Sequence, residues 1–173
     1  MAKSDSFFIR AKVNGTLGNF AQTEIDLGAY VDALGKSVLR IHNINYSWYP
    51  TASAGGASDW NLGGNVSGYH VCQVTTQSQT TPVLASNKSV VGKCQLTLSN
   101  DTGTANRLSF VSQDTDVGPE RYENGYLIAT ENIYLGLDLA AGVGTDTSVD
   151  IIMECTVETM SREAAMALSL SQQ

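Results

Sequence analysis

Alternation of apolar and polar residues with a period of two is the feature that most constrains the fold of this chain. In segment 149–158, Val149, Ile151, Met153 and Cys155 alternate with residues that are mostly polar. Because successive side chains of a strand point to opposite faces of a sheet, this pattern predicts a half-buried strand. The same alternation predicts strands over residues 21–27, 92–99 and 133–139, and weaker patterns predict strands over 7–13, 36–49, 69–76, 107–112 and 125–130.

The segment 36–49 breaks its own alternation. Leu39 and Ile41 share one face of the predicted strand, whereas Ile44 and the apolar residues after it share the other. This change of face predicts a β-bulge near His42, or a strand that is buried on both sides. The length of the segment also suggests a strand that bends and serves two sheets.

Strands that follow one another without intervening helices are typical of an antiparallel sandwich or barrel. A C-terminal helix is predicted over 161–170, where Ser161 can cap the first turn and Glu163 is favoured by the helix dipole. The sequence lacks the repeated blade of a propeller and the Cys-Trp-Cys arrangement of an immunoglobulin domain. We therefore predict an all-β chain, a single domain over 1–173, folded as an antiparallel eight-stranded jelly-roll β-sandwich with a short C-terminal helix.

Composition limits the function classes. Hydrophobic residues make up 42% of the chain and charged residues 16%, which indicates a globular protein with a full core rather than a disordered one. The net charge of −7 divides into +2 over residues 1–100 and −9 over residues 101–173. Direct condensation of nucleic acid needs clustered Lys and Arg, so we do not expect it. The uneven charge suggests another hypothesis: if copies of the chain assemble, Arg10 and Lys12 in the basic half meet the acidic half of a neighbouring copy.

The N-terminus carries one basic residue, Lys3, and no following apolar run of signal-peptide length, so no export signal is expected. No apolar stretch is long enough to span a membrane. The cysteines, Cys72, Cys94 and Cys155, follow no CxxC spacing, and we interpret them as reduced thiols.

Residues that could carry chemistry are few, and we predict no catalytic site and no cofactor. Both histidines lie within predicted strands without a nucleophile motif, and packing explains the pair His70 and Cys72 better than metal binding does. Asp114, Asp116 and Glu120 resemble a fragment of a calcium loop, and a plain turn is the alternative interpretation. A hydrolase that uses carboxylates of the acidic half is a third, weaker interpretation.

Aromatic residues bracket the long loop 50–68. Trp48, Tyr49 and Trp60 either stack against a sugar, anchor the loop to the sandwich, or sit in a subunit contact. Together with Arg10 and Lys12 they form the predicted interface. Sugar stacking would favour a carbohydrate-binding or adhesin-type β-sandwich of a viral fibre or spike.

A family resemblance adds to these interpretations. The succession Phe7–Ala11, Thr23–Asp32 and Lys36–Ile41 looks like the opening of small single jelly-roll capsid proteins of icosahedral viruses. The run 132–139, the run 149–154 and the terminal helix are similar to the closing strands of those proteins.

The resemblance implies a structural virion protein, not an enzyme. It implies a capsid subunit that is made in the host cytoplasm and assembles laterally with copies of itself or a second capsid protein. The chain departs from many such coats because it lacks a basic arm. That departure would suit a shell over an internal membrane, or a shell in which another protein contacts the genome.

Overall fold

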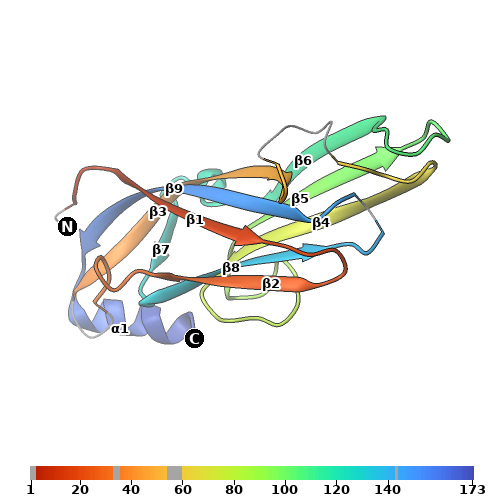
Figure 1. Ribbon diagram of the computed structural model, residues 1–173. Coiled ribbons are helices and arrows are strands. Elements are labelled where there is room, and N and C mark those ends of the chain that lie inside the picture. The colour runs from red at the N-terminus through yellow and green to blue at the C-terminus, as the bar shows by residue number, and fades with distance from the viewer. Residues whose placement is uncertain (1–2, 33–35, 54–59, 143) are drawn as a thin grey trace.

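The computed structural model describes residues 3–32, 36–53, 60–142 and 144–173, and it consists of two packed antiparallel sheets with one helix at the end of the chain (Figure 1). The elements are β1 (Phe7–Asn14), β2 (Phe20–Asp26), β3 (Ser37–Pro50), β4 (Val66–Thr75), β5 (Val90–Asn100), β6 (Phe110–Val117), the 3-10 helix η2 (Pro119–Arg121), β7 (Tyr126–Ile128), β8 (Asn132–Leu139), β9 (Thr147–Thr159) and α1 (Arg162–Ser171). The predicted all-β sandwich with a C-terminal helix is confirmed.

The strand order is that of a jelly roll. One sheet, sheet A, has the order β1-β9-β3-β7, and the other, sheet B, has the order β2-β8-β4-β5-β6. The first strand pairs with the last and the second with the last but one, as in a long hairpin wound around itself. The predicted number of eight strands is wrong, because β6 is added beside β5 at the edge of sheet B.

The unusual strand β3 owes its pattern to a bulge. Its register with β9 shifts between Ile41 and Asn43, which confirms the predicted bulge at His42. The extra residue changes which parity faces inward, so that Leu39 and Ile41 before it and Ile44 after it are all buried. The prediction that this strand serves two sheets is wrong, because the partners of β3 are β7 and β9, both in sheet A.

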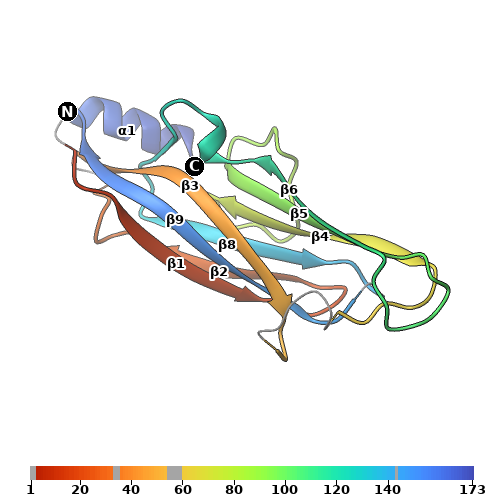
Figure 2. The same cartoon turned by 90° about the horizontal axis from the view of Figure 1, so that it is seen from above.

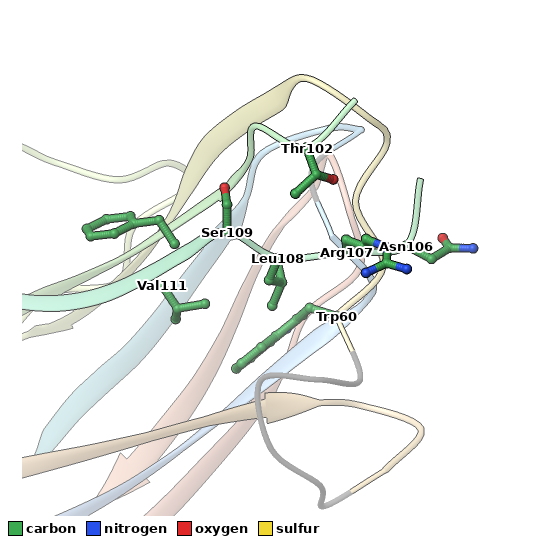
Figure 3. A pocket seen from close by; sticks show the side chains of 8 residues that line it. Trp60, Thr102, Asn106, Arg107, Leu108, Ser109 and Val111 are labelled. Carbon is green, nitrogen blue, oxygen red and sulfur yellow. The ribbon is translucent and has the colours of Figure 1, made fainter. Parts of the chain in front are cut away.

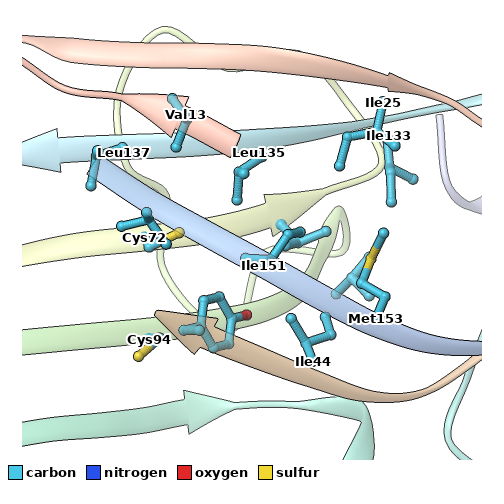
Figure 4. Packing of buried hydrophobic residues seen from close by; sticks show 14 of the residues in the cluster. Val13, Ile25, Ile44, Cys72, Cys94, Ile133, Leu135, Leu137, Ile151 and Met153 are labelled. Carbon is cyan, nitrogen blue, oxygen red and sulfur yellow. The ribbon is translucent and has the colours of Figure 1, made fainter. Parts of the chain in front are cut away.

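The hydrophobic core lies between the two sheets, where the predicted inward faces interdigitate (Figure 4). Leu135 and Leu137 of β8 meet Ile151 and Met153 of β9, and all of them are fully buried. The apolar positions of the alternating segments are therefore the positions that face the core.

The helix α1 packs on its own sandwich. Ser161 caps it by accepting a hydrogen bond from the Ala164 N–H at 3.2 Å, and Ala165 packs in a small cluster with Val38 and Ala129. The side chain of the buried Gln172, just beyond the helix, accepts from the Ala129 N–H at 2.9 Å and donates to the Leu127 carbonyl at 2.6 Å. These bonds fix the end of the chain against β7. No helix in the described part of the chain is long and apolar enough to cross a membrane.

Candidate interaction surface

Two of the four edge strands combine charge with exposed aromatic side chains. β1 ends the order of sheet A and β6 ends the order of sheet B, and Figure 2 shows them along opposite margins of the molecule. The outward-facing Phe8 of β1 is 55% exposed and Phe110 of β6 is 52% exposed. Large aromatic side chains at unpaired strand edges are typical of surfaces that meet another chain.

The predicted basic residues lie on the outer face of β1. Arg10 and Lys12 are both exposed, and with Asp150 and Ile152 of β9 they line a shallow cavity of about 450 Å³. The Arg10 guanidinium lies 5.9 Å from the centroid of the Phe8 ring. Arg10 takes part in neither of the ion pairs found among the described residues, so its charge is available to a partner.

Lys12 is held more closely than Arg10. Its ammonium lies 5.3 Å from the centroid of the Tyr49 ring, and the Tyr49 hydroxyl donates to Asp150 Oδ1 at 2.8 Å. The hydrogen bond with Tyr49 and the charge of Asp150 raise the pKa of Lys12. Partial burial is the main cause of the raised pKa of Tyr49. The half-buried Tyr49 therefore belongs to this surface together with the two cations.

The two tryptophans of the predicted interface lie in the core and not on this surface. Trp48 and Trp60 are buried in the core cluster, and the Trp60 Nε1–H donates to Thr147 Oγ1 at 2.8 Å. Trp60 thereby anchors the described end of the loop 50–68 to β9, whereas residues 54–59 of that loop lie outside the described residues. A sugar-stacking platform would need exposed ring faces, which neither buried indole presents.

A second cavity, of about 440 Å³, opens between Trp60 and the start of β6 (Figure 3). β7 pairs with β3 only at Leu39–Ile41, so beyond these residues β3 is the edge of sheet A, whereas β6 extends sheet B. In Figure 3 the side chain of Leu108 points toward the ring of Trp60. No residue of β6 is buried, which distinguishes it from the alternately buried β5 beside it.

The calcium candidate is not assembled. Asp114 and Asp116 lie on β6 rather than in a turn, and Glu120 lies on η2. All three carboxylates are exposed, and the described residues contain no group of three or more His, Cys, Asp or Glu side chains that could hold a metal ion. The alternation of oxygen-bearing residues that resembles a calcium loop is the alternation of an exposed strand.

The structure also reveals an ion pair that local sequence patterns do not predict. Arg40 of β3 binds Glu158 of β9 through two hydrogen bonds of 2.7 Å each, and Lys3 lies 4.0 Å from the same carboxylate. The hydrogen bonds from Arg40 lower the pKa of Glu158. The bulge residue His42 lies beside this pair with its Nε2 2.9 Å from Thr156 Oγ1, and burial lowers its pKa. The two partners are 118 positions apart in the sequence, so no local pattern announces them.

The hypothesis that a basic half meets an acidic half needs correction. Sheet A alternates strands of the first half, β1 and β3, with strands of the second half, β9 and β7. Charges of opposite sign from the two halves therefore meet within one molecule, as Arg40 and Glu158 do. The split of +2 and −9 is a property of the sequence and not of two faces of the fold.

Three side chains that could carry chemistry are fully buried, namely Cys94, Cys155 and His70. Burial raises the pKa of the Cys94 thiol to about 11 and that of the Cys155 thiol to about 12, and both are free thiols. The fully buried His70 accepts a hydrogen bond from the Ala140 N–H at its Nδ1, at 3.1 Å. Its Nε2 therefore carries the proton, and burial lowers its pKa to about 4.

This histidine predicts a pH dependence of stability. An unfolded histidine titrates near pH 6.5 and the folded His70 near pH 4, so the unfolded state binds more protons between these values. Stability that is present at pH 7 is then lost as the pH falls, by about 2 kcal/mol at pH 5. Denaturation curves of the wild type and His70→Gln should converge by about this amount between pH 7 and pH 5. Parallel curves would show that His70 does not carry the effect.

Comparisons with known proteins identify no family for this chain. No family model and no curated protein matches the sequence. Among solved structures, a chain from the three-dimensional structure of maize chlorotic mottle virus, determined by single-particle analysis, resembles this one. The match covers 91% of this chain and 96% of that chain, at 8% sequence identity and a TM-score of 0.32. At this level of similarity the match carries no argument about function, which must rest on the residues of this chain.

Proposed function

We propose that this chain is a structural virion protein, a capsid subunit that assembles laterally with copies of itself or a second capsid protein into an icosahedral shell. The observation that carries the proposal is that β1 and β6, at opposite margins of a jelly-roll sandwich, each have one side that pairs with no other strand in the described residues. β1 presents Phe8 and Arg10, and β6 presents Phe110 and a row of carboxylates. A subunit with complementary surfaces on opposite sides can meet a neighbour on each side, which a closed shell requires.

The jelly roll is a fold that viral capsids use, but it also occurs in lectins and cupins, so the fold alone does not decide between them. The buried tryptophans count against the sugar-binding alternative. Trp48 and Trp60 pack in the core, so the aromatic platform of an adhesin does not form from them. A structural, non-enzymatic role is the interpretation that uses the exposed residues.

The proposal assigns genome contacts to another component. Two cations of sheet A lie close to carboxylates of the same molecule, Arg40 to Glu158 and Lys12 to Asp150. Such a surface is mixed in sign and would grip a polyphosphate poorly. A location in the virion, and a contact of the shell with a second capsid protein or an internal membrane, belong to the same proposal.

Sedimentation velocity of the purified chain over a range of protein concentrations tests the proposal. A capsid subunit is expected to form closed particles or discrete large oligomers as the concentration rises. Runs with calcium and with a chelator should agree, because the candidate ligands Asp114, Asp116 and Glu120 do not converge. A strict monomer at every concentration would overturn the capsid proposal. An oligomer that forms only with calcium would show that calcium takes part in assembly, against this expectation.

A further inference from the structure

The free edge of β1 carries two exposed cations, and the free edge of β6 carries two exposed carboxylates. Arg10 and Lys12 share the outer face of β1. Asp114 lies on the outer face of β6, opposite Gln95, and Asp116 follows in a bulge where the register between β5 and β6 shifts. The two edges are therefore opposite in charge.

Both strands are free to accept a neighbour on one side. In the described residues β1 pairs only with β9, and β6 pairs only with β5. Gly15, just after β1, donates its N–H to the Thr147 carbonyl, which fixes the alternation of the ladder between β1 and β9. By that alternation the N–H and C=O groups of Arg10 and Lys12 point away from β9, toward the open edge. An unpaired edge of this kind is a template for pairing with another chain.

Within the described part of the chain, the carboxylates of β6 have no cation of their own. Both ion pairs found there use Glu158, and Asp114 accepts a hydrogen bond from the Ser112 hydroxyl at 3.1 Å. The next cation along the chain is Arg121, which donates to the Thr115 carbonyl rather than to either carboxylate. The acidic row is therefore open to a counter-charge from outside the molecule.

We propose that β1 of one copy lies beside β6 of the next copy, with Arg10 and Lys12 facing Asp114 and Asp116. The occupant of each edge is thus a second copy of this chain. The charges of the two edges are opposite in sign, so this arrangement brings cations against carboxylates. The contact is head to tail, since it joins two different surfaces, and it can therefore propagate around a ring or shell.

This contact rests on the proposed function and deepens it by naming the surfaces that meet. It also replaces the idea of two charged halves with two charged strands. Exposed charge pairs steer association and are screened by salt, so the contact should weaken as ionic strength rises.

A charge-swap experiment tests the contact. One variant carries Arg10→Glu and Lys12→Glu, and a second carries Asp114→Lys and Asp116→Lys. Each variant alone sets like charges against like, so the protein concentration at half association should rise at least about tenfold. An equimolar mixture of the two should recover association, because each contact between unlike variants joins opposite charges.

A control variant separates this effect from a change of net charge. Glu123→Lys with Glu131→Lys shifts the net charge as much as the β6 variant does, at exposed positions outside β6. This control should associate like the wild type. Thermal unfolding of each variant checks that the monomer is folded.

The outcomes are distinguishable from those of the proposed function. If the wild type assembles and the mixture is no better than either variant alone, the contact between β1 and β6 is wrong while the capsid proposal stands. If the wild type never assembles, the capsid proposal fails. Recovery in the mixture but not in either variant alone supports the head-to-tail contact.

Discussion

Replacement of Trp60 by alanine is expected to lower the free energy of unfolding by about 4 kcal/mol, one of the largest effects of a single substitution in this chain. Trp60 is only 4% exposed and packs in the core cluster. Its ring lies against the backbone near Gly144, where a Cβ would stand 3.5 Å from Trp60 Cδ1. Its truncation would open a cavity and release the described end of the loop from β9.

A matched variant separates packing from hydrogen bonding. Trp60→Phe keeps an aromatic ring and removes the N–H that donates to Thr147 Oγ1. The Thr147 hydroxyl keeps its own bond to the Thr145 carbonyl. The free energy of unfolding should therefore fall by about 1 kcal/mol for the lost hydrogen bond, and by a further amount for a cavity smaller than that of Trp60→Ala. Urea denaturation measures both losses of stability, provided that the m-value is the same for the wild type and the variants. An unchanged midpoint for Trp60→Ala would show that Trp60 serves a surface role, which its position in a glycine-rich loop also allows.

Replacement of Arg40 by methionine is expected to destabilise the protein by about 3 kcal/mol at pH 7. The Glu158 carboxylate is buried, and Arg40 satisfies both of its oxygens. Without the guanidinium, that carboxylate would keep only Lys3, at 4.0 Å. A buried charge that has lost its partner is penalised by desolvation, which the methionine side chain does not offset.

The penalty should depend on pH in a defined direction. In the wild type the lowered pKa of Glu158 contributes stability above the unfolded value near 4.5 and loses it as the pH falls. In Arg40→Met, burial would raise the pKa of Glu158, so the variant regains stability as that group takes up a proton. The difference between wild type and variant should therefore shrink from pH 7 toward pH 4.

Two controls make this prediction sharp. Adding Glu158→Gln to Arg40→Met removes the orphaned charge and should recover a large part of the loss. Arg107→Met changes an arginine that takes part in neither ion pair of the described residues, and it should stay within about 0.5 kcal/mol of the wild type. If Arg40→Met behaved like Arg107→Met, the ion pair would have no structural importance.

The fold can be predicted from the sequence where the information is local. The period-two pattern of β9, the cap at Ser161 and the change of parity around His42 each depend on neighbouring residues, and the structure confirms all three. The sequence pattern predicts β6 too early and a turn at its acidic end, because an exposed edge strand carries little apolar alternation.

The interaction surface can be predicted only in part. Arg10 and Lys12 are exposed as expected, but the order of the strands decides which charges they meet. Sheet A places strands from opposite ends of the chain side by side, so neither the pair of Arg40 with Glu158 nor the burial of Trp60 follows from local spacing. A tryptophan in a glycine-rich loop has the same local sequence whether it anchors the loop or faces a partner.

Hydrogen exchange on the assembled and the dispersed protein tests most directly whether the free edges of the sandwich are the assembly surfaces. The assembled fraction, separated by sedimentation, should show new protection of backbone amides in β1 and β6, whereas the central strands are protected in both states. Assembly with protection confined to the outer faces of the sheets, and with β1 and β6 exchanging as in the monomer, would contradict the account.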